Sequence, residues 1–201
     1  MAPHEIVILV LGLGAVLAGL AWLIWSAVSI RFPPGQRIEL DTEAGTVVHV
    51  VLSDDISKVD VNRLASRTAI AVGASAQAWM QIRSEGGVDE DASEIDEVVI
   101  WFAPNTHMEA LAKMWGFKRL DGFIGKAKTR AFGFRYLPLA TISPLVADEV
   151  MMTGEPVIHE MMHALLRDYR GGVDGHTNPN VWTASGGAAS VQSLARKLFL
   201  A

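Results

Sequence analysis

The sequence predicts an α+β fold in which a single N-terminal transmembrane helix precedes one small domain. Three observations support this prediction. The chain has 201 residues, the length of one domain. An uncharged apolar run lies near its start, and β-branched segments alternate with helical periodicity in the remainder. We therefore expect an anchor and linker over residues 1–37 and a domain over residues 38–201.

The apolar run covers residues 6–30, IVILVLGLGAVLAGLAWLIWSAVSI, and contains no charged residue. As a helix it would be about 37 Å long, more than the roughly 30 Å hydrocarbon core of a bilayer. No basic region precedes it and no A-x-A cleavage site follows it, which favours a retained single-pass helix over a signal peptide. The lipid bilayer would then be the partner of residues 6–30, in a cell envelope or a virion membrane.

The orientation and association of this helix stay open. Arg31 and Arg37 follow the run, so the positive-inside rule favours a cytoplasmic C-terminal domain. Gly12, Ala15 and Gly19 would allow two such helices to approach closely, which predicts a homo-oligomer. The alternative is that small residues are simply common in membrane helices.

The elements of the domain are indicated by composition and periodicity. Segments rich in β-branched and aromatic residues predict strands, and Ala-rich or capped periodic segments predict helices. Pro138 would confine its strand to a sheet edge or a bulge. After the linker at 31–37, the expected order is a strand over 46–52, a helix over 60–82, a strand over 97–103, a helix over 105–116, an edge strand over 131–143, a helix over 155–169 and a short helix over 191–199.

The charges limit the classes of partner. The net charge of −5 argues against a nucleic-acid partner. Because the chain has no cysteine, any metal site must use His, Asp or Glu. The acidic segment 85–97 lacks EF-hand spacing and is expected to be a solvated loop. The basic segment 113–135 would either meet an anionic partner (lipid head groups, cell-wall polymer or an acidic peptide) or form a solvated face.

The motif H-E-M-M-H places His159, Glu160 and His163 in the predicted helix over 155–169. Residues four apart differ by about 40° around a helix, so both imidazoles can share one ion. Neutral imidazoles leave zinc strongly Lewis acidic, and the intervening glutamate can take a proton from water. The flanking residues are apolar nearly all round, which indicates a buried helix. Burying these three side chains is costly unless a metal pairs with them.

A third zinc ligand is within reach. The helix is expected to end near Tyr169, before two glycines that permit a left-handed turn. The chain from there to His176 is long enough to return to the metal. We therefore expect His176 as the third ligand. Asp174 would either ligate in its place or orient it from behind.

The stretch HEMMHALL…DGHTNPNVW resembles the minimal zincin metallopeptidases of the SprT-like and phage-type groups. In these groups a histidine after the helix is followed by a tryptophan, here His176 and Trp182. The resemblance implies a zincin-like domain with an active-site helix and a mixed sheet, with Zn²⁺ as cofactor. It implies that Glu160 is the general base and that the zinc ligands are His159, His163 and His176.

The sequence departs from neighbouring zincin groups. Tyr169 stands where a metzincin has its third histidine, and no glutamate ligand of the gluzincin kind is evident. The residue that would stabilise the oxyanion is open among Tyr169, Tyr136 and His107. His49 and His4 are not expected to take part in chemistry.

These observations predict a membrane-anchored, zinc-dependent metallopeptidase that hydrolyses protein or peptide substrates near the membrane. An extended peptide could add to the edge strand that precedes the motif. The first alternative is a membrane or virion structural protein with a non-catalytic zinc site. The second is a tethered interaction module in which the motif is accidental.

Overall fold

The computed structural model describes residues 14–21, 24, 32–56, 60–85, 95–114, 125–132, 135–166 and 187–201. Within the strands and helices, the side chains of residues 125–132, 135–136, 166 and 187–189 lie outside the description. The chain divides into two compact units, and the fold given below is that of the larger one, Pro33–Arg130 with Leu137–Ala201.

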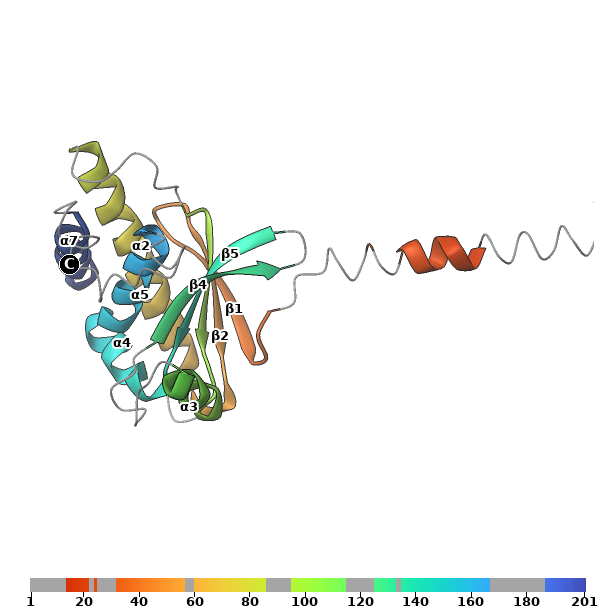
Figure 1. Cartoon of the computed structure of the whole chain (residues 1–201). Helices are drawn as coiled ribbons and strands as arrows, with labels where there is room; N and C mark the ends of the chain where they lie inside the picture. Colours follow the sequence, from red (N-terminus) through yellow and green to blue (C-terminus); the bar gives the residue numbers. More distant parts are fainter. Residues whose placement is uncertain are drawn as a thin grey trace, which may run out of the picture. The chain divides into compact units, whose positions relative to one another are not determined.

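The described strands form a five-stranded mixed sheet, which confirms the predicted α+β class. Strand order is β1-β2-β3-β5-β4, so β1 and β4 are the two edges (Figure 1). β2 pairs antiparallel with β1 and parallel with β3, and β3 pairs parallel with β5. The strands are β1 (Gln36–Asp41), β2 (Val47–Leu52), β3 (Glu97–Phe102), β4 (Gly125–Phe132) and β5 (Arg135–Ile142).

The predicted edge strand over 131–143 is wrong in two respects. The region contains two strands, and the one that carries Pro138, β5, is interior, between β3 and β4. The ladder with β3 begins at Leu139, opposite Val99, so Pro138 lies just before the paired residues. A proline there does not remove a donor from the ladder with β3.

The helices agree closely with the sequence predictions. Asp60 caps α2, and its side chain accepts hydrogen bonds of 3.1 Å from the backbone N–H groups of Asn62 and Arg63. Three short helical segments before the motif helix, η1, η3 and α4, were not predicted. The bounds are η1 (Asp54–Ile56), α2 (Val61–Ser84), α3 (Asn105–Met114), η3 (Pro144–Val146), α4 (Ala147–Thr153), α5 (Glu155–Leu166) and α7 (Gly187–Leu200).

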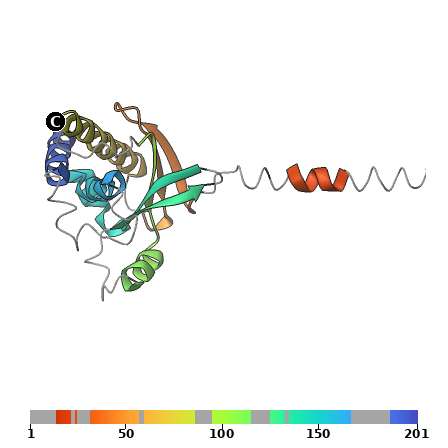
Figure 2. The same cartoon turned by 45° about the horizontal axis from the view of Figure 1, so that its top comes forward.

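The main core lies between the sheet and one layer of helices. Both views show α2, α4, α5 and α7 together on one face of the sheet (Figures 1 and 2). Val48, Val50 and Leu52 of β2 point into this core, in which Trp79 and Ile158 are also buried. The intervening residue Val51 is fully buried on the opposite face. Strand β2 is therefore buried on both sides, as an interior strand in a mixed sheet should be, although His49 stands beside Val51 on the second face.

The structure contradicts the predicted transmembrane helix. Of residues 6–30, the structure describes 14–21 and 24, and all of these are helical. Across the described ranges, no helix combines the length and the apolar character needed to cross a bilayer. This finding overturns the single-pass anchor in the predicted fold and the membrane localisation derived from it. An apolar composition alone predicted the span, but a span also requires one long continuous helix.

Candidate functional site

The motif helix α5 begins at a sharp junction with α4. Gly154 ends α4 in the left-handed conformation, with φ of 67°, and its N–H donates to the carbonyl of Val150. Thr153 then caps the new helix, because its hydroxyl accepts from the N–H of Glu155 at 3.3 Å. Pro156 lies in the first turn of α5, where no intrahelical donor is needed.

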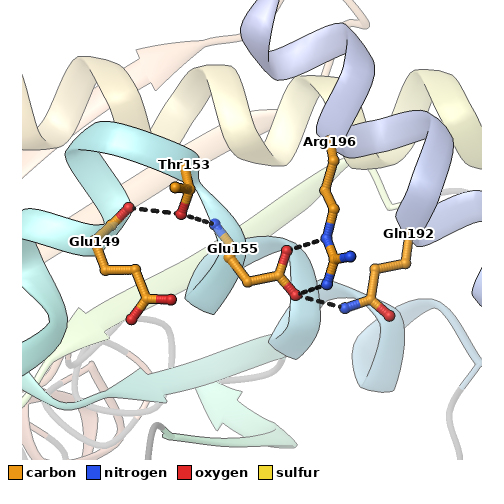
Figure 3. Close-up of polar contacts among 5 residues, drawn as sticks. All are labelled: Glu149, Thr153, Glu155, Gln192 and Arg196. Carbon is orange, nitrogen blue, oxygen red and sulfur yellow. Dashed lines mark hydrogen bonds and ion pairs between the residues drawn. The ribbon is translucent and has the colours of Figure 1, made fainter.

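The first turn of α5 is also held by the C-terminal helix. Figure 3 shows the Glu155 carboxylate facing Gln192 and Arg196 of α7. Gln192 donates to it at 2.8 Å, and Arg196 donates to both of its oxygens from Nε and Nη2. The hydrogen bond to Glu155 raises the pKa of the Arg196 guanidinium. The negative charge of Glu155 acts in the same direction, against the lowering effect of partial burial.

The aromatic end of α7 covers the junction itself. A Cβ built on Gly154 would lie 2.7 Å from the Phe199 ring, so this ring packs directly on the glycine backbone. The guanidinium of Arg67 in α2 lies 3.8 Å from the centroid of the same ring. Arg67 also donates to the carbonyl of Met151 at 2.9 Å. Helices α2 and α7 thus fix the point at which α5 starts.

The three motif residues lie together on α5. The rings of His159 and His163 have centroids 5.0 Å apart and an interplanar angle of 81°. Both histidines are half-buried, whereas Glu160 is only 3 % exposed. The opposite side of the helix is in the core, where Ile158 and Met161 are fully buried. The predicted burial of this helix is therefore confirmed, and its two histidines are close enough to approach one ion.

The remaining residues predicted for the site are placed less completely. His176, Asp174 and Tyr169 lie outside the described residues, and the Tyr136 side chain is not described. Within the ranges that are described, no group of three or more His, Asp or Glu side chains is arranged to hold a metal ion. The pair on α5 would supply two ligands, so a third has to come from another segment.

The structure does not bring His107 to this helix. Its ring packs against Trp101, with centroids 4.6 Å apart. Trp101 lies between Ile100 and Phe102 in β3, which both point into the helix-covered core. Because side chains alternate along a strand, Trp101 and its neighbour His107 belong to the opposite face of the sheet. This removes the geometric basis for His107 as an oxyanion-stabilising residue.

His49 has a more specific environment than the sequence suggested. It is 5 % exposed, and its Nε2 lies 2.7 Å from Glu97 Oε1. Its Nδ1 lies 3.2 Å from Glu39 Oε2. Strand register explains the contact, since Glu39 stands directly opposite His49 across β1 and β2. The sequence could not reveal this arrangement, because it depends on which strands are neighbours.

Comparison with known proteins gives no relative for this chain: no family model, no curated protein and no solved structure matches it.

Proposed function

We propose that the protein is a zinc-dependent hydrolase of peptide bonds, with its active site on α5. The proposal rests on one observation above others: a buried helix presents two adjacent, half-buried imidazoles, with a buried carboxylate between them in sequence. Glu160 is 3 % exposed, and a role in chemistry would explain why a carboxylate occupies this position next to the two histidines.

The donor set on α5 fits zinc. Neutral imidazole nitrogens are preferred zinc ligands, and a ring separation of 5.0 Å between His159 and His163 is compatible with convergence on one ion. The third ligand is proposed to be His176, or Asp174 in its place. The apolar side chains beneath the pair would keep bulk water away and hold the rings in fixed orientations.

The three motif residues on α5 have two proposed roles: His159 and His163 are zinc ligands, and Glu160 is the general base. Zinc, when bound, supplies Lewis acidity that polarises the substrate carbonyl and makes water more acidic. His159 and His163 would hold the ion through lone pairs on their ring nitrogens. Glu160 takes a proton from the attacking water as the water oxygen bonds to the carbonyl carbon. The same carboxyl then delivers this proton to the leaving nitrogen as the C–N bond breaks, so the protons balance.

Zinc stoichiometry of the purified full-length chain tests the metal site. We expect about one zinc per chain, the number that a single site of this kind holds. The metal should be lost in His159→Ala and in His163→Ala and retained in His107→Ala, the matched histidine control. Comparing His176→Ala with Asp174→Ala identifies the third ligand. A folded wild-type chain without zinc would refute the proposal.

Glu160→Gln tests catalysis separately from metal binding. The amide is similar in size but cannot take a proton, so zinc should be retained while hydrolysis of a peptide library falls by about 10²–10⁴-fold. If the wild-type chain binds zinc but cleaves no peptide, the site is a non-catalytic zinc site, which is the alternative interpretation of the motif.

A further inference from the structure

The two edges of the sheet differ in charge pattern. β1, with sequence QRIELD, places Arg37, Glu39 and Asp41 at alternate positions and so mixes both signs. β4, with sequence GKAKTRAF, places Lys126, Lys128 and Arg130 at alternate positions and contains no acidic residue. Residues two apart in a strand belong to one face, so β4 concentrates positive charge along one face of one edge.

In the described part of the chain, β4 is an outer strand of the sheet. Strand β5 occupies its inner side, and among the described strands none lies beyond it. An edge strand exposes a row of N–H and C=O groups that can accept another extended chain. The open edge thus supplies general affinity for an extended peptide, and the alternating positive charges supply a means of selection.

Cross-strand pairing determines which peptide fits. Residues directly opposite in neighbouring strands have Cβ atoms about 4.5–5.5 Å apart, at which opposite charges attract and like charges repel. An incoming strand with Asp or Glu at alternate positions would align these with Lys126, Lys128 and Arg130. A second copy of β4 would instead set like charges opposite one another, which disfavours pairing between two molecules.

We propose that β4 is a docking edge for extended acidic peptides, which add to the sheet as a sixth strand. Selectivity comes from residues 126, 128 and 130, and affinity comes from the backbone ladder. The inference concerns binding and stands apart from the proposed hydrolysis. It also gives a role to part of the basic segment 113–135 in the sequence.

Peptide binding to the full-length Glu160→Gln chain tests this proposal, since this variant cannot consume the probe by the proposed reaction. The probe is a short fluorescent peptide in which Glu and Thr alternate, and binding is followed by anisotropy. We expect it to bind, its Lys–Thr counterpart not to bind, and an isomer with all Glu residues consecutive to bind about tenfold more weakly. Equal binding of all three peptides would overturn the proposal.

Charge reversal identifies the surface. Reversing the three basic residues of β4 together should weaken binding of the alternating peptide about tenfold or more, while a triple reversal on exposed helix positions should leave it nearly unchanged. The conservative variant Lys128→Gln should weaken binding of the alternating peptide about threefold. This single variant keeps the test valid even if the triple variant does not fold. If the two triple variants lost peptide binding equally, net charge alone would attract the peptide, and this result would contradict the proposal. The β4 set is Lys126→Glu, Lys128→Glu and Arg130→Glu, and the control set is Arg63→Glu, Lys113→Glu and Lys197→Glu.

Backbone methylation tests strand addition itself. In a paired strand, alternate N–H groups point toward the neighbour, so N-methylation of one alternating set should abolish binding and methylation of the other should not. Equal effects of the two sets would exclude a ladder. If the wild-type chain binds no peptide and the β4 triple variant only self-associates, the lysines merely protect the edge from self-pairing, and the proposal fails.

Discussion

Gly154 is the residue on which the junction between α4 and α5 depends. Its backbone is left-handed, and the Phe199 ring occupies the space that a side chain would need. Any other residue would therefore meet two separate costs, one in backbone conformation and one in contact with the ring. Because the motif begins five residues later, at His159, the orientation of the helix follows from how this junction is packed.

We expect Gly154→Ala to lower the free energy of unfolding by about 2–4 kcal/mol, about 1 kcal/mol of which comes from the positive φ. Gly45→Ala is the matched control. Gly45 also has a positive φ, of 81°, but a Cβ added there would meet no atom within 4 Å. Gly45→Ala should therefore lower the free energy of unfolding only by the contribution of the positive φ, about 1 kcal/mol. Urea denaturation measures both variants, and equal losses would contradict the packing argument.

Helix α5 is held by α7 at its first turn. Glu155 accepts from Gln192 and from Arg196 (Figure 3). The ring of Phe199 packs on Gly154, the residue before Glu155. The side chain of Arg196 is 49 % exposed and that of Glu155 is 23 % exposed, so solvent weakens the attraction between them. The bidentate geometry works in the other direction, because two parallel charge-assisted hydrogen bonds strengthen the attraction between Arg196 and Glu155.

A double-mutant cycle on Glu155→Gln and Arg196→Gln should give a coupling energy of about 0.5–1 kcal/mol, smaller at high salt. The same cycle with Lys197→Gln in place of Arg196→Gln should give a value near zero, because Lys197 is exposed and adjacent but is not part of the contact. Denaturation with urea at low and high salt provides the measurement. A coupling that is equal for the two basic residues would show that only general electrostatics operates.

Metal binding should be linked to the stability of the entire domain. The core packs α5 against α2 and α7, and Ile158 and Met161 of α5 belong to it. If α5 carries the proposed metal site, opening this site therefore requires loss of core packing. At a free zinc concentration of about 100 times the Kd, we expect the free energy of unfolding to rise by about 2.7 kcal/mol.

This rise should disappear with a chelator and in His159→Ala, and it should persist in Glu160→Gln. Unfolding curves at several zinc concentrations provide the measurement. If zinc stabilised His159→Ala as much as the wild-type chain, the ion would bind elsewhere.

The elements that sequence predicted correctly are those whose signal is local. Apolar periodicity and a high alanine content gave α2 within two residues at its end, and β-branched runs gave β2 and β3. In the motif, a separation of four residues was enough to place His159 and His163 side by side. The predicted transmembrane helix over residues 6–30 is wrong, because no helix in the described part of the chain is both long enough and apolar enough to cross a bilayer.

The sequence by itself determined the chemistry available to this protein: a cysteine-free chain, a helix with two histidines one turn apart around a glutamate, and a basic segment over residues 113–135. Only the tertiary structure decided that β5 is interior and β4 is the edge, that His49 lies between Glu39 and Glu97, and that α7 fixes the start of α5. The physical reason is that the spacing of apolar residues depends on which nearby residues lie on the same face of one helix or strand. Strand order and contacts between distant segments instead follow from packing the entire core at once.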